Sequence, residues 1–358
     1  MIPSYGVLFP TSIVGSLPRP AYVKDLISDD FRGSAADYRR LMENAVRSAV
    51  AMQEMAGLDV VSDGEWWRKS YIGVIAELAH GFELSRNPAD GRPWTVVVDK
   101  LSPKNPGFIA NEVKFLKTVT RRHIKATLPS PALLGERMWH PEKSKKAYPH
   151  VNDFVRDCVP ILRRELELLR DQGATIIQID DPHLCLFVDP DVRKKYDDAD
   201  RAANFDVEMV NELTAGFKGV KLAVHLCRRA GARVRGEESH GGTYDPIIEP
   251  LNRLNVHHLT MEFTAPGAGD TAVLKKLRED LEIGLGCVSC HPGQIDSPEA
   301  IVARVETALK HIDKSRITLN PDCGFAPGSA ANVDIDEVYV KLKNEVEAAR
   351  RLREKYGK

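Results

Sequence analysis

Eight short, largely apolar runs, most of them separated by longer amphipathic stretches, constrain the fold of this chain more than any other feature. The runs cover 11–16, 58–65, 123–131, 174–182, 221–227, 257–263, 282–291 and 316–325. Near-continuous apolar strands that alternate with helices are typical of a parallel sheet covered by helices. Eight strand–helix units also close a (β/α)₈ barrel, so we predict a single α/β domain of TIM-barrel type over residues 1–358.

Helix signals between the runs support this prediction. Residues 37–57 and 151–173 have amphipathic helical periodicity, and Gly173 provides a stop signal for the second helix. Ser297 followed by Pro298 predicts a helix start. A doubly wound open sheet is the alternative, but no G-x-G-x-x-G follows an early run. The long connection after the second run, with its insertion at about 84–122, is expected to form a hairpin or lid.

Charge and apolar content limit the partners. Fifty basic residues balance fifty-one acidic residues, so nothing favours nucleic acid or an anionic membrane as a partner. No apolar run approaches the ~20 residues that span a bilayer, and the first residues lack a signal-peptide pattern. We therefore expect a cytoplasmic protein, in which the six cysteines are core residues, metal ligands or reactive thiols.

Polar residues gather where the predicted strands end, which is the catalytic face of a barrel. His225 and Cys227 end the fifth run, and residues i and i+2 of a strand face the same side. Glu262 and Cys323 end the sixth and eighth runs. One imidazole, two thiolates and one carboxylate form a donor set that suits Zn²⁺ better than Mg²⁺ or Ca²⁺.

The remaining cysteines are assigned outside this zinc site. Cys158 falls in a helical pattern and Cys287 within a strand, so both are expected in the core. Cys185 and Cys290 lie nearer the barrel mouth, but neither has an evident partner. A zinc ion with several anionic ligands holds a substrate thiolate better than it activates water, which indicates S-alkylation more than hydrolysis.

The order of these motifs resembles the catalytic domain of cobalamin-independent methionine synthase. Similar segments run through nearly the whole chain, as "IVGSLPRP", "SDGEWW", "QIDDP", "HLC", "GCVSCHPGQIDS" and "NPDCGF". The resemblance implies a zinc barrel in which His225, Cys227, Glu262 and Cys323 hold the metal and homocysteine sulfur accepts a methyl group.

The same resemblance implies roles for four more residues. It assigns Ser16 to the homocysteine carboxylate, and Glu65 and Asp180 to its ammonium group, a charge-assisted pairing. It assigns His291 to the proton of the methyl donor. Solvated-loop and helix-cap roles are the alternatives for the two acidic residues.

Departures from the family leave the donor and the acceptor open. The resemblance covers only the catalytic one of the two barrels in full-length members, and the third strand end lacks the tryptophan that stacks on the pterin. Trp66, Trp67 and Trp139 are candidates for an aromatic wall. The donor is a methylfolate, a methylcorrinoid or, in the alternative reading, an epoxide.

Three other functions compete with the methionine synthase reading. Epoxyalkane:coenzyme M transferase is similar in the same way, and Arg228 and Arg229 could meet the sulfonate of its thiol or could be solvated loop residues. The pair of Glu65 and Asp180 favours an ammonium-bearing thiol instead. A non-catalytic zinc barrel and a metal-free barrel enzyme are the remaining hypotheses.

Overall fold

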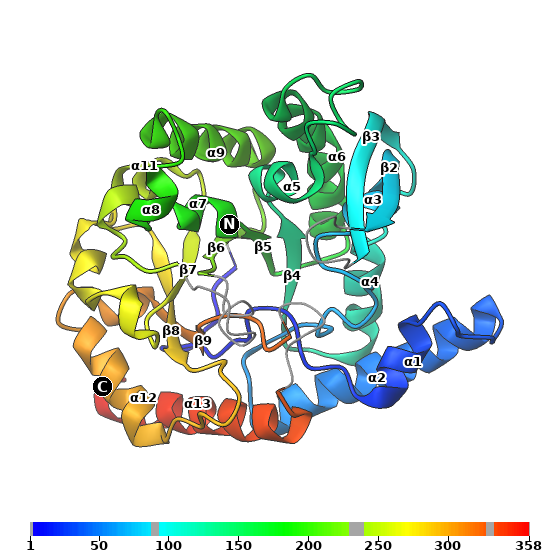
Figure 1. Ribbon diagram of the computed structural model, residues 1–358. Coiled ribbons are helices and arrows are strands. Elements are labelled where there is room, and N and C mark those ends of the chain that lie inside the picture. Colours follow the sequence, from blue (N-terminus) through cyan, green and yellow to red (C-terminus); the bar gives the residue numbers. More distant parts are fainter. Residues whose placement is uncertain (1–2, 87–92, 229–239, 327–332, 358) are drawn as a thin grey trace.

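Seven parallel strands form the central sheet of the computed structural model, which describes residues 3–86, 93–228, 240–326 and 333–357. The strand order is β1-β4-β5-β6-β7-β8-β9, so each strand pairs with its neighbour in sequence within this sheet (Figure 1). The bounds are β1 Val60–Val61, β4 His123–Pro129, β5 Ile176–Asp180, β6 Lys221–Leu226, β7 His258–Glu262, β8 Glu282–Val288 and β9 Ile317–Pro321. These strands fall within the predicted runs.

The first predicted run, 11–16, closes the ring with two bridges instead of a full strand. Thr11 pairs with Leu319 of β9, and Ser12 pairs with Val60 of β1. Beyond Ser12, successive carbonyls accept hydrogen bonds from buried side chains, so no strand ladder continues there. Since the bridges join the first and last strands of the sheet, the predicted TIM-barrel fold class is confirmed.

Helices surround the sheet in Figure 1. The α-helices of six or more residues are α1 Ala21–Ile27, α2 Ala35–Ala56, α4 Ala110–Val119, α5 Pro131–Met138, α6 Val151–Asp171, α9 Ala199–Thr214, α11 Ile248–Arg253, α12 Pro298–Ala308 and α13 Ile335–Tyr356. Short helices α3 Ile75–Leu78, α7 Pro182–Leu186 and α8 Pro190–Arg193 fill connections. The predicted start of α12 is present, because Ser297 Oγ accepts the Ala300 N–H at 3.2 Å.

An antiparallel hairpin lies between β1 and β4. It consists of β2 Ala79–Arg86 and β3 Pro93–Pro103, and it stands beside α3 and α6 at the rim in Figure 1. The hairpin begins before the insertion predicted at 84–122, because residues 79–83 already pair with β3.

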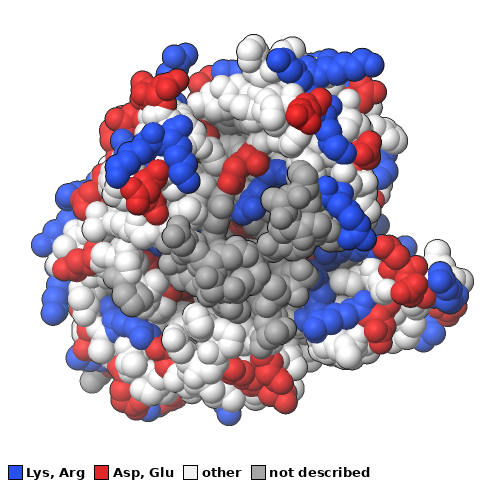
Figure 2. All heavy atoms as spheres, in the orientation of Figure 1, with Lys and Arg blue, Asp and Glu red and all other residues white. Residues whose placement is uncertain are grey.

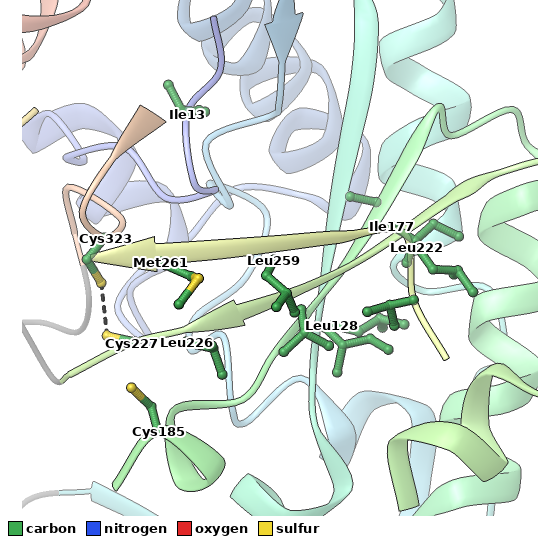
Figure 3. Close-up of a cluster of buried hydrophobic side chains, with 14 of the residues drawn as sticks. Ile13, Leu128, Ile177, Cys185, Leu222, Leu226, Cys227, Leu259, Met261 and Cys323 are labelled. Carbon is green, nitrogen blue, oxygen red and sulfur yellow. Dashed lines mark hydrogen bonds between the residues drawn. The ribbon is translucent and has the colours of Figure 1, made fainter. Parts of the chain in front are cut away.

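The strands divide an apolar outer face from a polar barrel interior. Outward residues such as Ile177, Leu222 and Leu259 belong to the buried core cluster (Figure 3). The alternate residues meet inside the barrel, where Lys125 Nζ donates to Ile13 O at 2.6 Å and His258 Nε2 lies 2.8 Å from Thr318 Oγ1. Because strand residues alternate faces, this inner row continues upward to the residues at the barrel mouth.

The outer surface carries charges of both signs. Figure 2 shows Lys and Arg interspersed with Asp and Glu on one face of the molecule. Among the helices of the described residues, none is long and apolar enough to cross a membrane.

Candidate metal and thiol site

Three predicted ligands meet at the mouth of the barrel. The ligand atoms of His225, Cys227 and Cys323 all lie within 4.8 Å of one another, and all three residues are buried. His225 is in β6, Cys227 follows that strand directly, and Cys323 follows β9. The sheet therefore brings together ligands that are 96 residues apart in the chain.

The His225 ring is oriented so that one nitrogen is free for a ligand. Nδ1 lies 3.0 Å from Asp180 Oδ1, and an ionised carboxylate can only accept, so Nδ1 carries the hydrogen. Nε2 is buried and has no hydrogen-bond partner within the described part of the chain. A buried lone pair without a donor fits a metal ligand, and a carboxylate on the other nitrogen is the usual support for such a histidine.

The two thiols face each other at close range. Cys227 Sγ and Cys323 Sγ are 3.1 Å apart and form no disulfide (Figure 3). The contact with Cys227 and burial raise the pKa of the Cys323 thiol. A soft divalent cation between these sulfurs would offset their mutual repulsion as thiolates, so the donor set fits Zn²⁺.

Glu262 reaches the same region without joining the three-atom group. It ends β7 and is fully buried, and its Oε1 accepts the Arg228 backbone N–H at 2.7 Å. Because Arg228 directly follows Cys227, this bond places the carboxylate beside the thiol pair. The structure therefore brings three of the four predicted ligands together directly and leaves Glu262 beside them.

Arg228 is a buried residue, and the prediction of a solvated loop residue is wrong for it. Its side chain is 1% exposed. Its guanidinium donates to the carbonyl oxygens of Gly242, Gly267 and Ala268 and lies over the Tyr244 ring, so contacts with the protein hold it in place. Arg229 lies outside the described residues.

The three-ligand group opens into a small pocket that also contains the predicted substrate residues. The cavity volume is about 50 Å³, which is enough for more than one water molecule. The lining residues are Val14, Gly15, Ser16, Glu65, Tyr71, Asp180, Pro182, His225, Cys227, Cys323 and Gly324. Two thiol residues, two carboxylate residues and two hydroxyl residues thus line one space.

Glu65 is held in the pocket by a chain of buried polar groups. Its backbone has a φ of 60°, a left-handed conformation that is strained for a residue with a side chain. Thr127 Oγ1 donates to Glu65 Oε1 at 2.7 Å, and Arg68 Nη1 donates to Thr127 Oγ1 at 2.9 Å. Burial raises the pKa of Glu65, and the Arg68 guanidinium opposes that rise.

Glycines give these pocket groups their space. A Cβ at Gly15 would lie 2.8 Å from Glu65 Oε1, and a Cβ at Gly324 would collide with Ser16 Oγ. Ser16 Oγ accepts the Ala326 N–H at 3.2 Å, which fixes its position beside the pocket. Close backbone approach at both glycines lets the carboxylate and the hydroxyl face the cavity.

His291 lies outside the pocket lining, and Tyr71 is part of it. His291 is half-buried after β8, its backbone contacts Ser289 and Lys341, and it is not among the residues that line the pocket. Tyr71 lines the pocket, although no sequence pattern indicated it. Burial raises the pKa of the Tyr71 hydroxyl, with Cys227 adding to the rise, so it stays a hydrogen-bond donor.

The remaining predictions concern cysteines and tryptophans, and their outcomes differ. Cys158 and Cys287 are fully buried core residues, as predicted. Cys185 lies beside the thiol pair in Figure 3. Trp66 packs in the core with its indole N–H toward Leu17 O, and neither it nor the other two candidate tryptophans lines the pocket.

Together, the barrel and the imidazole–dithiol group at its mouth define an α/β-barrel protein with a candidate thiolate metal centre. Residues 9–351 match the model of the family described as cobalamin-independent synthase, catalytic domain. The chain belongs to this family, and it is a methyltransferase, as the sequence predicted.

Proteins of similar length resemble this chain in sequence or in fold. A methionine synthase of Pyrococcus horikoshii is 26% identical over 355 residues, covering 97% of this chain and 93% of that protein. One from Saccharolobus solfataricus is 27% identical over 357 residues, covering 97% and 96%. A B12-independent methionine synthase of a Shewanella species, solved in complex with selenomethionine, superposes with a TM-score of 0.79 at 21% identity, covering 98% of this chain and 99% of that chain.

Proposed function

We propose that this protein is a zinc-dependent S-methyltransferase that converts homocysteine to methionine. One observation carries the proposal: the free Nε2 of His225 and the two sulfurs share a pocket with the Glu65 and Asp180 carboxylates. A thiol-activating group and an ammonium-binding group in one small space match a thiol substrate that also carries an amine.

His225, Cys227 and Cys323 would hold Zn²⁺, with Glu262 at the end of β7 as the fourth ligand. When bound, zinc lowers the pKa of a coordinated thiol and so supplies a nucleophilic thiolate at neutral pH. The hydrogen bond from His225 Nδ1 to Asp180 keeps the Nε2 lone pair directed away from that carboxylate.

The remaining pocket residues bind and orient the thiol substrate. Glu65 and Asp180 would pair with its ammonium group, and Ser16 would donate to its carboxylate. Buried carboxylates that face a cation in a water-poor pocket give a stronger pairing than surface charges do. Tyr71 lines the same pocket, and its hydroxyl would orient the sulfur or the carboxylate.

His291 would accept or supply the proton of the methyl donor. It follows β8 at the barrel mouth and is half-buried, so a donor bound over the mouth could reach it. A methylfolate or a methylcorrinoid is the proposed donor. The comparisons do not favour the coenzyme M alternative, since the relatives are methionine synthases and Arg228 is committed to backbone carbonyls.

A panel of thiols tests this proposal. Zinc content per chain is measured first, and homocysteine, coenzyme M, cysteine and glutathione are then compared for binding by calorimetry. We expect homocysteine to bind most tightly, and Glu65→Gln to weaken homocysteine much more than a thiol without an amine. Equal weakening of both thiols would contradict the ammonium role. Zinc that binds with no response to any thiol would favour a closed structural site.

A further inference from the structure

The buried side-chain amide of Gln178 in β5 contacts two parts of the pocket lining, the segment at Val14 and the carboxylate of Asp180. Gln178 is 0% exposed, and its Nε2 donates to Asp180 Oδ1 at 2.8 Å and to Val14 O at 3.0 Å. Val14 belongs to the segment that carries Ser16, and Asp180 lies opposite His225 in the β5–β6 register. One side chain therefore fixes the substrate-binding segment and the carboxylate that supports the histidine.

The contacts of Gln178 permit only one orientation of its amide. Both Nε2 hydrogens meet acceptors, a carboxylate oxygen and a backbone carbonyl. The flipped amide would turn its oxygen toward these two acceptors and lose both bonds. On the other side, the Thr260 hydroxyl lies 3.4 Å from Gln178 Oε1 and can donate to it.

Asp180 divides its two oxygens between the protein and the pocket. Oδ1 accepts from the Gln178 amide and from His225 Nδ1–H at 3.0 Å. Among the described residues, no hydrogen bond is made to Oδ2, and Asp180 lines the pocket. The oxygen that sets the imidazole tautomer and the oxygen left for a cationic ligand thus belong to one carboxylate.

We infer that Gln178 is a positioning residue that couples recognition of the substrate ammonium group to zinc binding, through the two oxygens of Asp180. The inference rests on the proposed function. An ammonium group on Oδ2 and the imidazole on Oδ1 share one carboxylate, and the Gln178 amide holds that carboxylate in the orientation that serves both. Coupling between two ligands is reciprocal, so an amine-bearing thiol should tighten zinc binding, and zinc should tighten that thiol.

The test compares two thiols that differ only in the amine, homocysteine and 4-mercaptobutyrate. Zinc affinity is measured by competition with a chromophoric chelator, with each thiol and without thiol, for the wild type, Gln178→Leu and Thr260→Val. For the wild type we expect homocysteine to strengthen zinc retention more than 4-mercaptobutyrate does. Gln178→Leu should weaken zinc about tenfold, the low end for loss of a supporting contact, and should reduce the difference between the thiols.

Thr260→Val is the matched control, because it alters only the contact to Gln178 Oε1 and leaves both Nε2 bonds in place. It should keep the wild-type zinc affinity and the wild-type preference. A Gln178→Leu protein that keeps the full preference for homocysteine overturns the inference, and so does a Thr260→Val protein that loses it equally.

Failure of the proposed function gives a different result. If the wild-type protein binds zinc but does not distinguish the two thiols, the proposed ammonium site is wrong. The inference about Gln178 then fails with it. Circular dichroism checks the fold of each variant. If Gln178→Leu does not fold, Gln178→Met removes the same donors with an unbranched chain, and the same two outcomes decide.

Discussion

Replacing Arg68 with methionine tests how the polar wall of the pocket is held together. Arg68 and Glu112 form a buried ion pair, with side chains 2% and 6% exposed. Arg68 Nη2 lies 2.6 Å from Glu112 Oε2, and Nε donates to both carboxylate oxygens at 3.0 and 3.1 Å. Removing one partner of such a pair typically destabilises a protein by about 3–5 kcal/mol, because a buried charge is left without compensation.

The loss should depend on pH in a defined direction. Burial raises the pKa of Glu112 to about 8 although Arg68 opposes that rise, so the variant carboxyl should have a still higher pKa. Both proteins therefore lose stability as pH rises from the ordinary glutamate pKa to about 8, and above about pH 8 only the variant continues to lose it. Above pH 8, each pH unit adds up to about 1.4 kcal/mol to the difference between the variant and the wild type.

Urea unfolding at pH 7, 8 and 9 measures both effects. Arg68→Met combined with Glu112→Leu should restore part of the lost stability. It should also remove most of the pH dependence, since the buried acid is gone. Arg350→Met in α13 is the control, because its ion pairs are exposed and should have no measurable effect. A single variant with the stability of the wild type, or one whose loss relative to the wild type is greater at pH 7 than at pH 9, would refute the reasoning.

Three substitutions probe the pocket itself. Gly15→Ala places a Cβ 2.8 Å from Glu65 Oε1, so the Michaelis constant for homocysteine should rise about tenfold, or about 1.4 kcal/mol, in steady-state kinetics while zinc content stays constant. Tyr71→Phe removes the hydroxyl of a residue that lines the pocket and should weaken thiol binding by about 1 kcal/mol in calorimetry, again without loss of zinc. His291→Gln should lower turnover roughly a hundredfold or more and flatten the pH–rate profile, with unchanged homocysteine affinity, if this side chain handles the donor proton. Wild-type kinetics in the His291 variant would remove that role.

The strand pattern, and the rule that residues two apart on a strand face the same side, account for much of the site prediction. Because His225 and Cys227 are two residues apart at a strand end, their common face follows from backbone geometry alone. Parallel strand ends meet at one mouth, so Cys323 could be placed with them without knowledge of any distance. The first run was harder, since buried side chains, and not strand neighbours, satisfy its carbonyls after Ser12.

Other positions depend on tertiary contacts that no local pattern encodes. Arg228 follows the metal motif, as a loop residue would, but three distant carbonyls and the Tyr244 ring bury it. Glu262 is at the predicted strand end, but the direction of its carboxylate is set by the hydrogen bond that it accepts from the Arg228 backbone N–H. Tyr71 lies in an irregular segment, where no helical or strand repeat predicts which way a side chain points.

The central claim, a zinc ion held by His225, Cys227 and Cys323 that receives the homocysteine thiolate, is tested most directly by X-ray absorption at the zinc edge. The spectrum is recorded on zinc-loaded protein before and after addition of homocysteine. We predict that the zinc signal gains one sulfur neighbour when homocysteine is added, and that a proton is released to solvent in the same titration. An unchanged number of sulfur neighbours with no proton release would contradict the claim.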